Sequence, residues 1–117
     1  MAAGLPEDLQ ELLECLDRGV AELYGERYRG LVLFGSYVRG EAGGEARGKD
    51  SDVVDLLVLL EGEVNGWQEY LKIEPISWPL SLESEYVLSI FPVNIEAYEK
   101  PRKPFIMNAL KEGVTLI

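Results

Sequence analysis

The sequence contains no histidine and a single cysteine, Cys15, among its 117 residues. One chain therefore cannot form a disulfide, a Cys/His zinc site, or a nucleophilic centre in which histidine activates serine or cysteine. Any acid–base chemistry must use carboxylates, lysine, tyrosine or bound water.

Positive charge is also scarce, with 11 basic residues against 21 acidic ones and a net charge of −10. Such a balance disfavours attraction to a polyanion, so we do not expect a nucleic-acid partner. No apolar segment approaches a membrane-spanning length, and no basic region followed by an apolar stretch opens the chain. We therefore expect a cytoplasmic protein without a membrane partner.

The composition and length indicate one globular domain over residues 1–117, since 47% of the residues are hydrophobic and 27% are charged. The strongest helical signal is a leucine-rich stripe at three- and four-residue steps near the N-terminus, with Pro6 in its first turn and Gly25 at its end. This helix is expected to pack on a sheet.

Two short apolar runs, Leu31–Phe34 and Leu56–Leu60, predict buried strands that lie side by side. Tyr86–Val93 predicts a third strand, and Pro92 places it at an edge. A closing helix is expected over Pro104–Lys111, followed by a short strand in Val114–Ile117. The fold class is therefore α/β (α+β), a small mixed β-sheet with helices packed on it.

The stretch Glu61–Glu85 is the least regular. Pro75 and Pro79 are expected to interrupt any helix there and to leave only a short one over Leu80–Glu85. Tryptophans 67 and 78 could stack on a nucleotide base, but core positions are favoured for both.

The most informative stretch places Gly35 and Ser36 after the first strand, and Asp50, Asp52 and Asp55 before the second. A Gly-Ser turn into a short helix over residues 36–40 would present backbone N–H groups to a phosphate. The aspartates could hold Mg²⁺, which prefers carboxylates and leaves positions open for substrate phosphates.

These two segments, GSYVRGEA at 35–42 and DSDVVDLLV at 50–58, resemble the signature of the minimal nucleotidyltransferases, the smallest members of the DNA polymerase β-like superfamily. The resemblance implies that fold, with phosphates bound by Gly35, Ser36 and Arg39 and Mg²⁺ bound by Asp52 and Asp55. For Arg39, a role in bracing the loop is equally open.

The same resemblance implies transfer of a nucleoside monophosphate to an acceptor hydroxyl, with ATP as the donor of AMP. Minimal members are often encoded beside a helical partner protein and act as antitoxins, some by AMPylating that partner. The family likeness therefore implies a nucleoside triphosphate substrate, a helical partner encoded nearby, and a homo- or hetero-oligomer.

The sequence departs from the family pattern in its aspartate spacing. The family separates its two metal-binding aspartates by one residue, whereas two residues separate Asp52 from Asp55, which a regular strand would send to opposite faces. Three explanations are open: a β-bulge at Val53-Val54, which we favour, a metal pair formed by Asp50 and Asp52, or a damaged metal site.

A second departure concerns the third strand, where the family carries another metal-binding carboxylate. Ser89 is our assignment for that vacant position, with Glu85 just before the strand and Glu96 just after it as substitutes. The alternative to an enzyme is thus a catalytically degenerate member that acts as a binding or antitoxin module. We favour the Mg²⁺-dependent enzyme.

Overall fold

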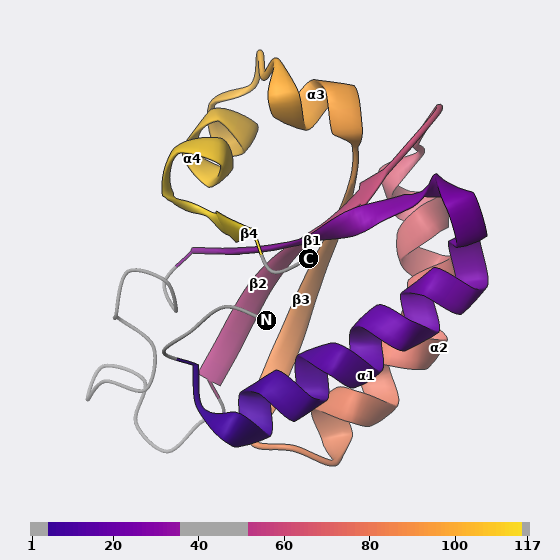
Figure 1. Ribbon diagram of the computed structural model, residues 1–117, viewed down its shortest axis with the longest axis vertical. Helices are drawn as coiled ribbons and strands as arrows, with labels where there is room; N and C mark the ends of the chain where they lie inside the picture. Colours follow the sequence, from indigo (N-terminus) through magenta and orange to yellow (C-terminus); the bar gives the residue numbers. More distant parts are fainter. Residues whose placement is uncertain (1–4, 36–51, 116–117) are drawn as a thin grey trace.

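The computed structural model describes residues 5–35 and 52–115, and for residues 52, 105, 112, 114 and 115 the backbone alone. Helices and strands follow one another in this order (Figure 1): α1 (Glu7–Tyr24), η1 (Gly25–Arg27), β1 (Tyr28–Phe34), β2 (Asp52–Leu60), α2 (Gly66–Leu82), β3 (Tyr86–Asn94), α3 (Ile95–Glu99), α4 (Pro104–Glu112) and β4 (Val114–Thr115).

The strands of the described chain form one mixed sheet in the order β3-β2-β1-β4. The central strand β2 pairs antiparallel with β1 and parallel with β3, and β4 pairs antiparallel with the other side of β1. The parallel pair needs a crossover, which α2 provides. The predicted mixed sheet, with its edge strand β3 and its C-terminal strand, is confirmed.

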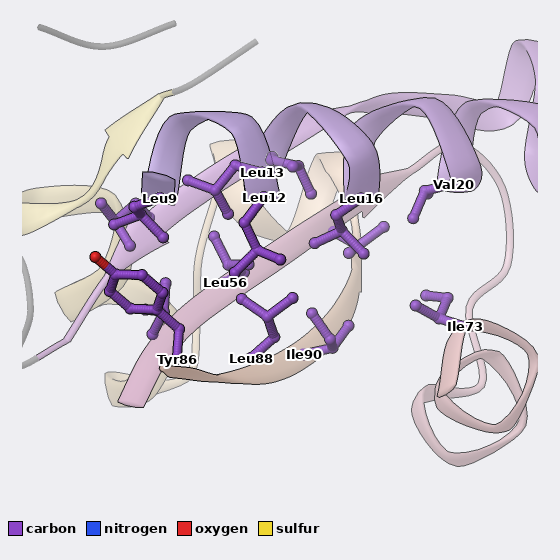
Figure 2. Close-up of a cluster of buried hydrophobic side chains, with 14 of the residues drawn as sticks. Leu9, Leu12, Leu13, Leu16, Val20, Leu56, Ile73, Tyr86, Leu88 and Ile90 are labelled. Carbon is purple, nitrogen blue, oxygen red and sulfur yellow. The ribbon is translucent and has the colours of Figure 1, made fainter. Parts of the chain in front are cut away.

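The first face of the sheet is covered by α1 and α2 (Figure 1). Figure 2 shows the leucine stripe of α1 lying on side chains of β2 and β3, with Ile73 of α2 at one end of the cluster. This stripe confirms the helix predicted from the leucine spacing, which follows Pro6 and ends at Gly25. It consists of Leu9, Leu12, Leu13, Leu16 and Val20.

The second face carries a smaller core against α3 and α4. Val32, Leu57 and Leu59 of the sheet pack there with Tyr98 and Ile106 of the two helices. In α4, Ile106 and Ala109 are buried, whereas Leu110 is exposed. No helix in the described part of the chain is both long enough and apolar enough to cross a bilayer.

Helix α2 corrects the prediction for residues 61–85, because it continues through both Pro75 and Pro79. The two prolines lie four residues apart and are exposed, so water can replace the backbone hydrogen bonds that they remove. The opposite side of the helix packs Ile73 into the core. Packing on that side holds together a helix that local propensity disfavours.

Two tyrosine hydroxyls hold the end of α1 to its neighbours. Tyr28 donates to Asp17 at 2.6 Å, and Tyr24 donates to Glu69 of α2 at 3.0 Å. Burial, followed by the bond to the adjacent carboxylate, raises the pKa of both tyrosines above the usual value.

Alkaline pH should therefore destabilise the fold. Below about pH 10 both states keep these protons, whereas above it the unfolded tyrosines ionise and the folded ones do not, so unfolding becomes more favourable by about 1.4 kcal/mol per pH unit for each. Tyr28→Phe should have a shallower slope between pH 10 and 11, measured by denaturant titration. Equal slopes in the two proteins would contradict the assignment.

Candidate functional site

Gly35 and Asp55, predicted to share a site, are in direct contact. Gly35 follows the last residue of β1 with φ of +81°, and a Cβ atom placed on it would overlap the Asp55 carboxylate. Phe34 pairs with Asp55 across β1 and β2, which brings the glycine turn beside the carboxylate. The structure therefore brings a residue of the Gly-Ser segment next to a residue of the aspartate segment.

Asp55 belongs to a row of side chains that crosses the second face of the sheet. Its partner on β1 is Phe34 and its partner on β3 is Ser89, both by backbone register. Asp55 and Ser89 are both partly buried. The register therefore places Ser89 beside Asp55, where the family pattern predicted the position of the third carboxylate.

The β-bulge predicted at Val53-Val54 is absent. Residues 52–55 of β2 pair one for one with residues 86–89 of β3, without a shift. The register shift in the β1–β2 pairing falls between Tyr28 and Gly30, which pair with the last two residues of β2, at the end of that strand away from Asp55. The bulge prediction was wrong because the parallel partner β3 fixes every residue of β2 in a regular ladder.

Glu85 and Glu96, the predicted substitutes for the third carboxylate, are not brought to Asp55. Glu85 is exposed beside Asp8 of α1, in a cavity on the first face. Glu96 lies in α3, beyond the opposite end of β3. The remaining predictions, Ser36, Arg39 and Asp50, lie outside the described residues, and Asp52 is described by its backbone alone.

The chemistry of this corner suits a hard cation. The Asp55 carboxylate supplies oxygen donors of the kind that Mg²⁺ binds, and the chain has no histidine and one cysteine to favour a softer metal. Among the described residues no three carboxylate, histidine or cysteine side chains gather as a metal cluster. At this corner the structure describes the Asp55 carboxylate beside Gly35.

The sequence interpretation missed Phe91, which forms the wall next to this row. Its ring meets Phe34 edge to face, with centroids 5.6 Å apart. Alternation along β3 is the signal that identifies it, since Ser89, Phe91 and Val93 are spaced by two and share a face. Phe91 therefore lies next to the row, on the side toward the C-terminal end of β3.

Gly35→Ala should destabilise the protein more than an alanine at another left-handed glycine. Gly62, with φ of +84° and no atom within 4 Å of the place where a Cβ would stand, is the matched control. The backbone cost is about 1–2 kcal/mol at each position, and only Gly35→Ala adds an overlap with Asp55. Denaturant unfolding measures both, and equal losses would show that the carboxylate does not press on residue 35.

Comparisons with known proteins identify the family. A family model described as the nucleotidyltransferase domain matches residues 14–116. A crystal structure of a candidate nucleotidyltransferase from Sulfolobus solfataricus has a TM-score of 0.49 and 15% sequence identity, covering 97% of this chain and 90% of that one. No curated protein matches the sequence.

Proposed function

Because the chain belongs to the nucleotidyltransferase domain family, we propose that it transfers AMP from ATP to an acceptor hydroxyl. The observation that carries the proposal is the contact between Gly35 and Asp55, which places a carboxylate beside the turn expected to hold phosphates. Nucleotidyl transfer suits a chain without histidine, since positioning and charge neutralisation supply most of the catalysis.

In the proposed reaction the acceptor oxygen forms a bond to the α-phosphorus of ATP. The bond from that phosphorus to the oxygen bridging the α- and β-phosphates breaks, and pyrophosphate leaves with the electron pair. The hydroxyl proton passes to water. The turn at Gly35 and Ser36 holds the β- and γ-phosphates, and Arg39 adds a positive charge.

Asp55, with Asp52 or Asp50, would hold Mg²⁺. When bound, this ion neutralises charge on the triphosphate and polarises the α-phosphate. The bare Gly35 leaves room for the Asp55 carboxylate at this corner, and Ser89 is the register partner of Asp55 on β3.

A catalytically degenerate binding module is the second candidate. The regular register of β2 leaves the wide aspartate spacing uncorrected, and Ser89 lacks the carboxylate that the family carries on this strand. Such a module would neutralise a partner protein by contact, as an antitoxin does, and would need no metal. AMPylation of a helical partner encoded nearby is the corresponding proposal for the active enzyme.

Calorimetry with a non-hydrolysable ATP analogue separates the two candidates. The enzyme should bind the analogue in the presence of Mg²⁺ and much more weakly after chelation. Asp55→Asn and Asp52→Asn should each remove most of the Mg²⁺-dependent part of the affinity. Equal binding of the analogue by the unaltered protein and both variants, with and without Mg²⁺, would favour the degenerate module.

A further inference from the structure

The outward side of helix α2 carries a stripe of large apolar side chains. Trp67, Leu71, Trp78 and Leu82 are exposed by 68%, 46%, 53% and 67%, respectively. Their spacings of four, seven and four residues keep all of them within about 60° around a helix of 3.6 residues per turn. The core positions favoured for both tryptophans from the sequence were therefore wrong. We call these four side chains the α2 stripe.

The inward side of α2 is apolar as well. Ile73 lies in the core of the first face, and Ile76 lies against Gly19 of α1. The sheet and α1 thus cover this side of the helix (Figure 1). A helix that is apolar on all sides is typical of a helix that is buried on all sides. The stripe is the side of α2 that no other part of the described chain covers.

One end of the α2 stripe is held in place. The ring of Trp67 stacks on Tyr70 with centroids 5.9 Å apart, beside a groove of about 550 Å³ that follows β3 to Lys103. The same turns of α2 are fixed by the buried Glu69, which accepts a hydrogen bond from Tyr24. Rigid aromatic side chains lose little conformational entropy on binding. This end of the stripe is therefore preorganised for contact.

The area of the stripe suits a weak but specific interface. With about 200 Å² for a whole tryptophan or leucine, these exposures leave roughly 450 Å² of apolar surface in water. Apolar patches of about 300–600 Å² are the largest that monomers usually expose, and they often mark binding sites. Two stripes in contact would bury about 900 Å², and flanking residues bring the total near the ~1,200 Å² at which stable interfaces begin.

The charge of the chain favours approach along this helix. Each copy has a net charge of −10, so most of its surface repels a second copy. Helix α2 has only Lys72, Glu69 and Glu74 as charged residues, and Glu69 is buried and paired with Lys72 at 3.5 Å. Two copies therefore meet little repulsion here. A strongly charged partner protein would find few complementary charges along the stripe.

The order of side chains in the stripe matches its own reverse. In an antiparallel pair of α2 helices centred halfway along the stripe, Trp67 lies level with the other copy's Leu82. Leu71 lies level with the other copy's Trp78 in the same way. Each large ring then faces a smaller side chain, which lets the two layers interdigitate. A parallel pair would instead place tryptophan on tryptophan. A surface that fits its own copy about a two-fold axis makes a closed dimer.

We propose that the α2 stripe binds the α2 stripe of a second copy of this chain in an antiparallel, two-fold symmetric dimer. The stripe is self-complementary in order, almost free of charge and large enough for a weak interface. The contact lies outside the helices that cover the first face, whereas Gly35 and Asp55 meet at the second face, so both copies keep their candidate sites open. This inference goes beyond the proposed function and does not depend on it.

Sedimentation equilibrium of the full chain tests the contact. The mean mass should rise with concentration from 13.1 kDa toward twice that value. An interface of this size predicts a dissociation constant on the order of 10 µM. Trp78→Glu should raise that constant at least about 30-fold, because it places an unpaired charge in the contact. A chain that stays monomeric up to about 1 mM would overturn the proposal.

Met107→Glu is the matched control for Trp78→Glu. It introduces the same charge at an apolar side chain of α4 that is 51% exposed and lies outside the stripe. Its dissociation constant should equal that of the unaltered chain. Equal effects of the two substitutions would place the contact elsewhere and overturn the proposal.

Salt distinguishes this apolar contact from one held by ion pairs. Because both copies carry a charge of −10, screening should strengthen the dimer between about 50 and 500 mM NaCl. Association that weakens several-fold over this range would rest on ion pairs and would contradict the proposal.

Disulfide crosslinking tests the antiparallel arrangement. In a Cys15→Ser background, Pro75→Cys places a thiol beside its own copy near the two-fold axis, so mild oxidation should give a crosslinked dimer. Leu82→Cys is the matched control, because its two thiols would lie 15 residues or about 22 Å apart along the pair. Crosslinking at residue 75 alone supports the proposal. Crosslinking at both positions would indicate a parallel pair, crosslinking at neither would indicate another surface, and either result would overturn it.

The contribution of Leu71 to stability should depend on protein concentration. Well below the dissociation constant the stripe is in water, so Leu71→Ala should cost little. Above about ten times that constant the cost should rise, because association stabilises the folded chain by mass action. Urea unfolding at the two concentrations measures both values, and a cost that does not change with concentration would count against the dimer.

Discussion

Asp55→Asn is expected to slow the proposed AMP transfer by about 10²–10³-fold while the protein remains folded. Asparagine keeps the size of the side chain, so the contact with Gly35 can persist, but it removes the negative charge. Loss of one preorganised electrostatic group in an active site has an effect of this order. Pyrophosphate release from ATP in the presence of Mg²⁺ measures the rate, and circular dichroism checks the fold.

Glu85→Gln provides the matched control for this loss of charge. Glu85 lies beside α1 on the first face and not at the Asp55 row, so pyrophosphate release should be unchanged. Retention of most of the activity in Asp55→Asn would remove Asp55 from the catalytic machinery. Equal losses in the two variants would mean that general charge, and not this position, governs the rate.

Leu56→Ala is expected to lower the free energy of unfolding by about 2–5 kcal/mol, a large fraction of the usual stability of a domain. Leu56 is fully buried on the central strand and lies under the leucine stripe of α1 (Figure 2). Shortening it leaves a cavity between the sheet and the helix, which two rigid layers cannot fully close. Urea unfolding at neutral pH measures the loss.

The matched control is Leu71→Ala, which removes the same atoms from a side chain of α2 that is 46% exposed. Its cost should be about 1 kcal/mol or less, since much of that side chain is already in water. A Leu71→Ala loss as large as that of Leu56→Ala would show that the exposed side of α2 is covered in solution, for instance by a second molecule.

Much of the fold could be predicted because the apolar periodicity of α1 and the continuous apolar runs of β1 and β2 are local signals that packing reinforces. Helix α2 could not be predicted in the same way. Local rules place a break at Pro75 and Pro79, and only the buried side of the helix, made with residues far along the chain, keeps it continuous.

The contact between Gly35 and Asp55 was predictable because Gly35 directly follows one recognisable strand and Asp55 directly precedes the apolar run of another, and the two strands were expected to lie side by side. The register of β2 could not be predicted, because an extra residue between two aspartates is compatible with a bulge or with a regular strand. Pairing with β3 decides between the two. The groove along β3 that Trp67, Phe91 and Lys103 line could not be predicted from the sequence either, because it combines residues of α2 and β3 with the start of α4, which meet only in the folded chain.

The close approach of Gly35 to Asp55 links two positions in evolution. As long as the aspartate is retained, any side chain at residue 35 is penalised, so glycine should persist there in descendants that keep the carboxylate. A descendant that first replaces Asp55 by a smaller residue loses the steric part of this constraint and keeps only the backbone part. Glycine at 35 with aspartate at 55 would then mark homologues that keep the proposed site.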